Sequence, residues 1–300
     1  MVKLLLGWED VDPNHADKHN RTPLGWAALR GHKGVVKRLL QRGNVDPNHS
    51  DKYDQTPLRC PAADGHEGIV RLLLGREDID PNRPDWNDRT PLGCAAGEGH
   101  EGAVELLLGR VDVDPNRADK YGQTPLGRAA INGHEGVVKL FLEREDVDPN
   151  RPDTDYRTPL GWAAVEGNEG AVKLLLERGD VDPNFPDKHD QTPLRCATSS
   201  GHEGVVKLLL GRGDVYPNRP NQDYRTPLGC AATEEYGGVV ELLLEYEGVD
   251  PNGPDRHGGI PLSYSAGRGH GGVAKLLQVR KSKESAYAPR LTCYKRPRLN

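Results

Sequence analysis

The stretch TPLGWAAVEGNEGAVKLLLER, residues 158–178, contains the pattern from which the fold follows. Thr158 is a natural N-cap, and Pro159 suits the first position of a helix, where its missing N–H costs nothing. The pattern predicts a short helix that ends at Gly167 and a second helix from Glu169, with apolar residues on one side and charged residues on the other. Neither helix can bury its apolar side alone, so neighbouring copies must stack to form the core.

The same block recurs every 34 residues, with no insertion between copies. We number the repeats one to eight by the Thr-Pro-Leu motif, in which isoleucine replaces threonine in the last copy. The motif begins at Thr22, Thr56, Thr90, Thr124, Thr158, Thr192, Thr226 and Ile260. An Asp-Pro-Asn motif keeps the same spacing, with Tyr216 in place of one aspartate. Between the second helix of one repeat and the first helix of the next, the chain is expected to form an extended loop, here called a finger.

A finer pattern relates the two halves of the chain. RTPLGWAA occurs at 21–28 and 157–164, and DQTPLRC occurs at 54–60 and 190–196. The copies are separated by 136 residues, which is four repeats. We infer a block duplication that relates repeats five to seven to repeats one to three.

One repeat, DKYGQTPLGRAAINGHEGVVKLFL at 119–142, closely resembles the ankyrin-repeat family. The resemblance covers roughly residues 1–279 and implies a mainly α solenoid of stacked helix-turn-helix units with projecting β-hairpin or loop fingers. We expect one continuous array, with a partial unit at 1–14 and then about eight 34-residue units, followed by a basic, disordered tail at 280–300. The 34-residue spacing with VDPN between units is similar to the arrays of filamentous fungi, which often form the sensor part of larger nucleotide-dependent receptor-like chains.

Charge and composition exclude several classes of protein. The segment 280–300 carries seven Lys and Arg against Glu284, which leaves 33 basic and 44 acidic residues elsewhere, a net charge of about −11. This argues against general affinity for nucleic acid phosphates. No apolar run approaches the ~20 residues that cross a bilayer, so we expect no membrane association. We expect a cytoplasmic protein with free thiols, and YKRPRLN at 294–300 is either a nuclear import signal or a solvated end.

The sequence offers no basis for catalysis. GEGHEG at 97–102 and GRGHGG at 267–272 match a dinucleotide-binding spacing, but both follow a helix, whereas the fingerprint requires a preceding strand. They are interpreted as turn glycines. No HExxH, GxSxG or GxxxxGK[ST] motif occurs. We therefore expect no enzyme and predict no catalytic, cofactor-binding or metal-binding residues, no cofactor and no small-molecule substrate.

Two columns of chemically active side chains recur at single repeat positions. A metal stack or disulfides would be the functional interpretation, but neighbouring helices lie roughly 8–10 Å apart, too far for either kind of bond. Structural turn histidines and packed thiols are favoured. The histidines are His32, His66, His100, His134, His202 and His270, and the cysteines are Cys60, Cys94, Cys196 and Cys230.

Function is expected where the repeats differ, which is at the finger tips and at the ends of the first helices. Aromatic rings at the tips would act as interface anchors, although tyrosines that simply tolerate solvent, or that pack on the next loop, remain an alternative. The family resemblance implies that these positions line the concave face used for protein partners. We predict a protein partner of mixed charge bound by a monomer, through Lys52, Tyr53, Trp86, Asn87, Lys120, Tyr121, Asp155 and Tyr156 at the tips and Glu98, Ile131 and Glu166 at the helix ends.

The alternative to a binding scaffold is a detached repeat array without an independent partner. MVKLLLG at 1–7 looks like the last turns of a second helix whose first half is missing, which suggests a truncated sensor part of a larger fungal receptor-like NTPase chain.

Three departures from the family pattern are expected to have structural effects. Pro61 lies inside a first helix and should distort repeat two, because proline costs about 3 kcal/mol there. Tyr156 and Tyr224 occupy the glycine position of the finger turn, so those two tips should differ in shape. Arg128 should stack on Trp162.

Overall fold

The computed structural model describes residues 12–287, with side chains described through residue 280. Within these residues the regular elements are sixteen helices, α2 to α17, and no strand occurs. The fingers in this part of the chain are therefore loops with a tight turn at the tip, rather than β-hairpins with a strand ladder. None of the helices between residues 12 and 287 combines the length and apolar character that a membrane span requires.

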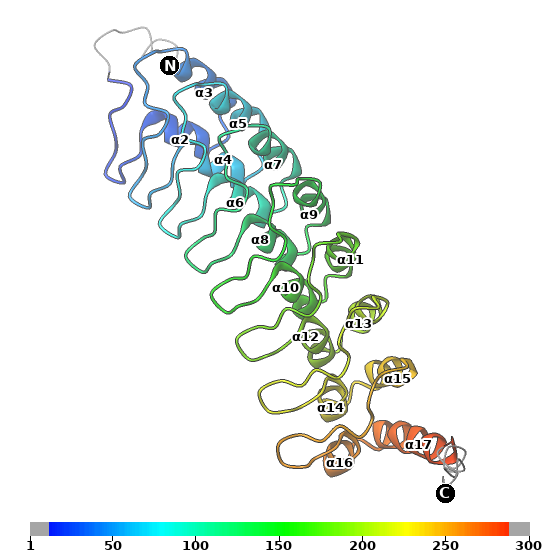
Figure 1. Cartoon of the computed structure of the whole chain (residues 1–300). Helices are drawn as coiled ribbons and strands as arrows, with labels where there is room; N and C mark the ends of the chain where they lie inside the picture. Colours follow the sequence, from blue (N-terminus) through cyan, green and yellow to red (C-terminus); the bar gives the residue numbers. More distant parts are fainter. Residues whose placement is uncertain (1–11, 288–300) are drawn as a thin grey trace, which may run out of the picture. The chain divides into compact units, whose positions relative to one another are not determined.

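The helices alternate between two rows, and the chain divides into two compact units. Within the first unit, residues 1–163 and 170–181, the first helices of successive repeats follow one another in one row and the second helices in another (Figure 1). Its helices are α2 (Pro23–Leu29), α3 (Lys33–Leu40), α4 (Arg59–Ala63), α5 (Glu67–Leu74), α6 (Pro91–Gly97), α7 (Glu101–Leu108), α8 (Pro125–Ile131) and α9 (Glu135–Leu142), with most of α10 (Pro159–Glu166) and α11 (Glu169–Glu177).

The second unit comprises residues 164–169 and 182–300. It repeats the same two rows within itself (Figure 1). Its helices are α12 (Pro193–Ser200), α13 (Glu203–Leu210), α14 (Pro227–Thr233), α15 (Gly237–Glu245), α16 (Pro261–Gly267) and α17 (Gly271–Tyr287). Helix α17 continues into the segment 280–300 for which the sequence analysis expects disorder. Residues 288–300, with YKRPRLN, and residues 1–7 lie outside the described residues.

The first helices begin as the sequence predicts. In repeat four, the Oγ1 atom of Thr124 accepts a hydrogen bond from the Gly127 N–H at 3.0 Å, and Pro125 occupies the first turn. Such a cap is worth about 1 kcal/mol, because it satisfies one of the four N–H groups that a helix start leaves without a partner. The same cap recurs at Thr22, Thr90, Thr158, Thr192 and Thr226.

The core consists of small and branched apolar side chains at equivalent positions of successive repeats. In repeat four, Leu126, Ala129 and Ala130 of α8 are buried together with Val137 and Phe141 of α9. Each fully buried leucine, valine or phenylalanine contributes about 1.5–3 kcal/mol relative to an exposed one. In repeats one, three, four, five and seven the first helix carries two adjacent alanines, whose small side chains allow neighbouring first helices to approach closely.

Side chains of the Asp-Pro-Asn motif connect each repeat to the next. The Nδ2 atom of Asn116 donates to the Asp146 carbonyl at 2.6 Å, and its Oδ1 atom accepts from the Asp148 N–H at 2.9 Å. One asparagine thus satisfies a backbone donor and a backbone acceptor of the following repeat. Equivalent pairs of bonds are made by Asn14, Asn48, Asn82, Asn184 and Asn218.

Arginines connect each repeat to the preceding one. The Nη1 atom of Arg110 donates to the Leu74 carbonyl at 2.9 Å, at the end of the preceding second helix, while Nε and Nη2 hold Asp112. A cation at a helix C-terminus is favourable because the carbonyls there carry partial negative charge. Arg76, Arg144 and Arg178 do the same for α3, α7 and α9.

Pro61 distorts repeat two, as the sequence predicts. Helix α4 begins only at Arg59, whereas the equivalent helices begin at the proline of the Thr-Pro-Leu motif. The Oγ1 atom of Thr56 is consequently buried without a hydrogen-bond partner, as is Nε2 of His49. Both residues line a cavity of about 10 Å³, which is close to the volume that one water needs.

Candidate functional site

Seven of the eight finger tips begin with an aspartate, which we call the base aspartate, and Asn221 takes its place in repeat seven. The base aspartate is buried in repeats two, three, four, six and eight. In repeat two, the Oδ1 atom of Asp51 accepts hydrogen bonds from the N–H groups of Tyr53, at 2.8 Å, and Gln55, at 3.1 Å. These bonds close the turn and hold the last tip residue, Asp54, at a φ of 58°. The tip side chains therefore project from a turn that the backbone itself fixes.

The expected difference in shape at Tyr156 and Tyr224 is wrong. Their φ angles are 59° and 58°, in the left-handed region that Gly122 also occupies in its own finger. The Tyr156 N–H donates to the Asp153 carbonyl at 3.0 Å, as the Gly122 N–H donates to Asp119 at 2.8 Å. The bonds made by the base aspartate outweigh the roughly 1–2 kcal/mol that a side chain costs in this region.

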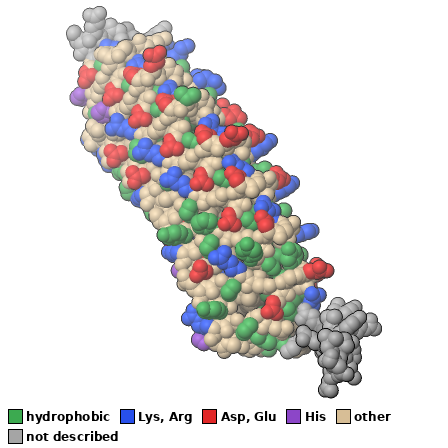
Figure 2. Space-filling view, in the orientation of Figure 1, with side chains coloured by type: hydrophobic (Ala, Val, Ile, Leu, Met, Phe, Trp, Pro, Cys, Tyr) green, Lys and Arg blue, Asp and Glu red, His purple; other side chains and the backbone are tan. Residues whose placement is uncertain are grey.

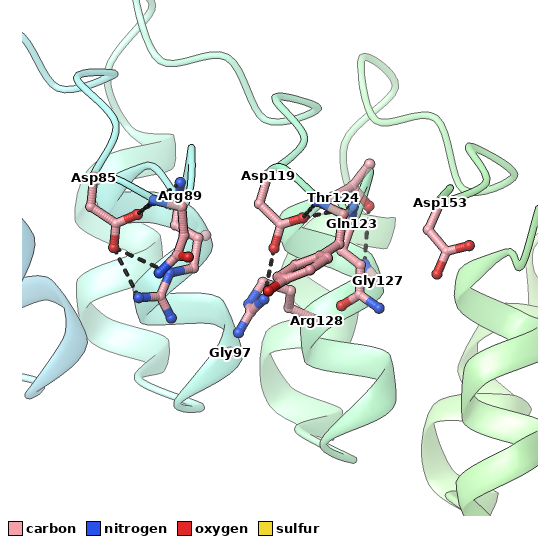
Figure 3. Close-up of polar contacts among 12 residues, drawn as sticks. Asp85, Arg89, Gly97, Asp119, Gln123, Thr124, Gly127, Arg128 and Asp153 are labelled. Atoms are coloured by element: carbon pink, nitrogen blue, oxygen red, sulfur yellow. Dashed lines mark hydrogen bonds and ion pairs between the residues drawn. The ribbon is translucent and has the colours of Figure 1, made fainter. Parts of the chain in front are cut away.

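The second carboxylate oxygen of the base aspartate is bound by one long donor in each of several repeats. In repeat four, Nη1 of Arg128 donates to Oδ2 of Asp119 at 2.8 Å (Figure 3). Trp26 and Trp162 donate in the same way to Asp17 and Asp153, at 2.9 and 2.7 Å. Tyr264 donates to Asp255, which lowers the pKa of that carboxyl to about 2.

Where cysteine occupies the donor position, arginines take over the second oxygen. Asp85 in repeat three is bound by Arg89 at 2.9 Å (Figure 3). It is also bound by Arg59 of the preceding repeat, at 3.4 Å. Asp51 is bound by Arg21 at 2.9 Å. The residue at this position thus determines whether the second oxygen is bound by its own side chain or, where it is cysteine, by neighbouring arginines.

The predicted contact between Arg128 and Trp162 is replaced by two others. Arg128 turns toward Asp119 of its own repeat, and the ring of Trp162 is covered by Arg157, whose guanidinium carbon lies 4.3 Å from the ring centre. The reason is electrostatic, since the carboxylate of Asp119 is almost fully buried and needs a cation.

The predicted tip residues of the first unit form a continuous row. Backbone bonds join successive tips: the Trp86 N–H donates to Tyr53, the Lys120 N–H to Asn87, and the Thr154 N–H to Tyr121, at 3.0–3.2 Å. One bond between each pair of fingers keeps the tips in register. We call the exposed side chains of this row, Lys52, Tyr53, Trp86, Lys120, Tyr121 and Tyr156, the tip row.

The aromatic rings of the tip row are exposed to solvent. Tyr53, Trp86, Tyr121 and Tyr156 have exposed fractions of 43, 59, 56 and 61 %. The ammonium of Lys120 lies between two of them, 4.5 Å from the centre of the Trp86 ring and 5.1 Å from that of Tyr121. The alternative that these rings are buried against the next finger is therefore not what the structure shows.

The other predicted site residues lie in different environments. Asn87 and Asp155 are half-buried parts of the tip turns, with their N–H groups bound by the base aspartates Asp85 and Asp153. At the helix ends, Glu98 is exposed and Ile131 half-buried. These four belong to the first unit.

Glu166 is exposed and belongs to the second unit. On the face that Figure 2 shows, acidic and basic side chains are interspersed rather than gathered into a patch of one sign.

The histidine column has a structural role. The Nε2 atom of His134 lies 3.0 Å from the Gly97 carbonyl of the preceding repeat, and its ring lies against Gly99, whose φ is 79°. A Cβ atom at Gly99 would lie 2.6 Å from the His134 ring, so the close approach requires glycine. No group of three or more His, Cys, Asp or Glu side chains within the described part of the chain could hold a metal ion.

The cysteine column is packed into the core. Cys60, Cys94, Cys196 and Cys230 are free thiols and are buried. Burial raises the pKa of the Cys60, Cys94 and Cys230 thiols, since the thiolate would lose its hydration. This environment fits packing and is unsuited to a nucleophile.

The sequence analysis missed the base aspartates and the asparagine and arginine connections. Their signal was present, because an aspartate recurs five residues before the threonine of most Thr-Pro-Leu motifs. The connections between repeats could not be assigned without the stacking geometry, since Arg21 and Asp51, or Asn116 and Asp146, lie 30 residues apart in the sequence.

Comparison with family models gives matches over most of the chain. A model described as ankyrin repeats in three copies matches residues 1–85, 77–153 and 145–221. A single ankyrin-repeat model matches residues 223–256. A search of curated proteins found no match.

Proposed function

Because the chain belongs to the ankyrin-repeat family, whose repeats generally mediate protein–protein interaction, we propose that it is a non-catalytic scaffold that binds a protein partner through the tip row. The helix-end residues Glu98 and Ile131 of the same unit would extend the contact.

The observation that carries this proposal is the set of four exposed aromatic rings at neighbouring finger tips. Aromatic side chains lose little conformational freedom on binding, and truncating one at the centre of an interface commonly costs 2 kcal/mol or more. The backbone bonds between the tips hold the rings in place before the partner arrives, which lowers the entropy cost of association.

The charges of the tip row indicate the chemistry of the partner. Lys52 and Lys120 are exposed beside the rings, and Lys120 already lies against two aromatic faces. Carboxylates of the partner would bind these ammonium groups, while Glu98 would bind a basic group. A partner of mixed charge fits this arrangement better than nucleic acid.

The test is an affinity capture from lysate of the source cells with two purified variants. The first carries Tyr53→Ser, Trp86→Ser, Tyr121→Ser and Tyr156→Ser. The matched control carries Tyr216→Ser, which removes a ring of 60 % exposure that lies outside the finger tips. Circular dichroism must first show equal helical content, because a partly unfolded array would bind nonspecifically.

The proposal predicts a protein captured by the native chain and the Tyr216→Ser control but lost from the tip-row variant. Equal capture by all three chains would mean that the tip row is not the site. No specific capture by any of them would favour the alternative of a repeat array without an independent partner.

We further propose that the protein acts as a monomer in the cytoplasm. The support for the cytoplasm is that four buried cysteines form no disulfide with one another, which suits a reducing compartment. A fluorescent fusion with and without residues 294–300 would test whether the basic end directs nuclear import, and sedimentation would test the monomer.

A further inference from the structure

Repeats three and seven are related by the 136-residue offset, and one difference between them changes a buried ionic cluster. Repeat three has Asp85 as its base aspartate, whereas repeat seven has Asn221. The two arginines of the cluster are kept: Arg59 corresponds to Arg195, and Arg89 corresponds to Arg225.

In repeat three the two guanidinium groups share one buried carboxylate. The Oδ2 atom of Asp85 lies 2.9 Å from Nη2 of Arg89 and 3.4 Å from Nη2 of Arg59. The side chain of Asp85 is completely buried, so the carboxylate is held by these two cations rather than by water. Its Oδ1 atom accepts from the N–H groups of Asn87 and Arg89.

In repeat seven the amide of Asn221 keeps the bonds to the backbone N–H groups but offers no carboxylate to the arginines. Its Oδ1 atom accepts from the N–H groups of Asp223, at 3.1 Å, and Arg225, at 3.0 Å. This fixes the orientation of the amide, since only the oxygen can accept. The Nδ2 group therefore stands where Oδ2 of Asp85 stands in repeat three, and a donor faces the arginines in place of an acceptor.

The two corresponding arginines lie in different environments. Arg225 turns to the following repeat, where its Nε atom lies 3.8 Å from Asp255 and its guanidinium carbon 4.8 Å from the centre of the Tyr264 ring. Arg195 stays between the first helices beside the Cys230 thiol, with an exposed fraction of only 9 %. Within the described residues it has no ion-pair partner, and its Nε atom is buried without an acceptor.

A buried guanidinium without a counter-charge is strongly unfavourable unless an anion neutralises it. Asn221 is also only 9 % exposed, so little of its surface is accessible to the side chain of a partner protein. A small monovalent anion from solution meets both conditions: it would accept from the guanidinium of Arg195 and from Nδ2 of Asn221.

We propose that repeat seven contains a binding site for a small monovalent anion, of the halide class, between Arg195 and Asn221. The anion occupies the role that the Asp85 carboxylate fills in repeat three. The site tightens the contact between repeats six and seven in proportion to the anion concentration.

The test measures thermal unfolding of the full chain in chloride, with gluconate replacing chloride at constant ionic strength. Gluconate is too large for the site, so ionic strength and specific binding are separated. We expect the unfolding temperature of the native chain to rise with chloride, by on the order of 3 °C between 5 and 500 mM, because the anion binds only the folded state.

Two reciprocal variants supply the matched controls. Asn221→Asp restores the carboxylate, so its unfolding temperature should exceed that of the native chain in gluconate and should not depend on chloride. Asp85→Asn creates the same cluster in repeat three, so the unfolding temperature of this variant should depend on chloride more steeply than that of the native chain, because two sites would bind the anion. The first variant is expected to fold at least as well as the native chain, so the test does not depend on a destabilised protein.

A second readout locates the ion directly. Crystals grown in sodium bromide should show an anomalous peak beside Arg195 in the native chain and none there in the Asn221→Asp variant. Equal chloride responses of the native chain and Asn221→Asp, or a water without anomalous signal at this position, would overturn the proposal.

Discussion

Replacing Pro61 by alanine should stabilise the protein, because it removes the only residue that prevents α4 from starting where the other first helices start. Repeat six supplies the reference. Its sequence is identical from 190 to 196, but Ala197 stands at the position equivalent to Pro61. There the helix α12 begins at Pro193, and Thr192 caps the Arg195 N–H.

The expected gain follows from what the change restores. The Thr56 cap contributes about 1 kcal/mol, and recovery of the first helical turn adds about two backbone hydrogen bonds, worth roughly 1 kcal/mol each. Against this, alanine increases the freedom of the unfolded chain by about 0.4–1 kcal/mol. The free energy of unfolding should therefore rise by about 2 kcal/mol.

The assay is urea unfolding followed by circular dichroism, with hydrogen exchange at residues 57–63 as a local measurement. Pro61→Ala should raise the urea midpoint and slow exchange of these amides. The reverse change, Ala197→Pro, should lower the midpoint and expose the start of α12. A neutral or destabilising Pro61→Ala would refute the reasoning, since it would mean that the short helix is set by its neighbours and not by the proline.

Three further predictions concern the base aspartates and the thiols. Arg128→Ala should lower the free energy of unfolding by about 3 kcal/mol, since it leaves the buried Asp119 carboxylate without its cation; adding Asp119→Asn should recover part of the loss in a double-mutant cycle. Tyr264→Phe should raise the pKa of Asp255 from about 2 toward its ordinary value. A carboxyl group whose pKa is lowered by folding stabilises the folded state above pH 4, and this stabilisation is lost as the pH falls toward 2. The variant should therefore be less stable at neutral pH, and its stability should depend less on pH in the acid range. NMR would measure the pKa, and urea unfolding at several pH values would measure the stability. The four buried thiols should react with a thiol reagent only as fast as the array opens, and rapid stoichiometric labelling of the folded chain would contradict their burial.

The helix pairs and their caps could be predicted from the sequence because they depend on residues close together in the chain. Thr124, Pro125 and Gly133 act within one repeat, and their spacing alone indicates where each helix begins and ends. The exposure of the tip rings could also be predicted from neighbouring residues, since side chains on a turn of polar residues point into solvent.

The connections between repeats depend on residues that meet only after stacking. Nothing near Asn116 in the sequence indicates that its amide binds Asp146 and Asp148 of the next repeat. The shape of the Tyr156 turn was mispredicted because the local preference of tyrosine was considered without the bonds from Asp153. Propensity is a weak guide where a buried carboxylate fixes the backbone.

The connections made by the asparagines and arginines have a mechanical consequence. Each of these hydrogen bonds joins a repeat only to its immediate neighbour. A force applied to the two ends of a unit therefore acts on the contacts between successive repeats in series, and distant contacts do not share it. The repeats should then detach singly when the chain is stretched. Each event would release 34 residues, or roughly 110 Å of contour length, and a pulling trace would show a regular sawtooth rather than a single rupture.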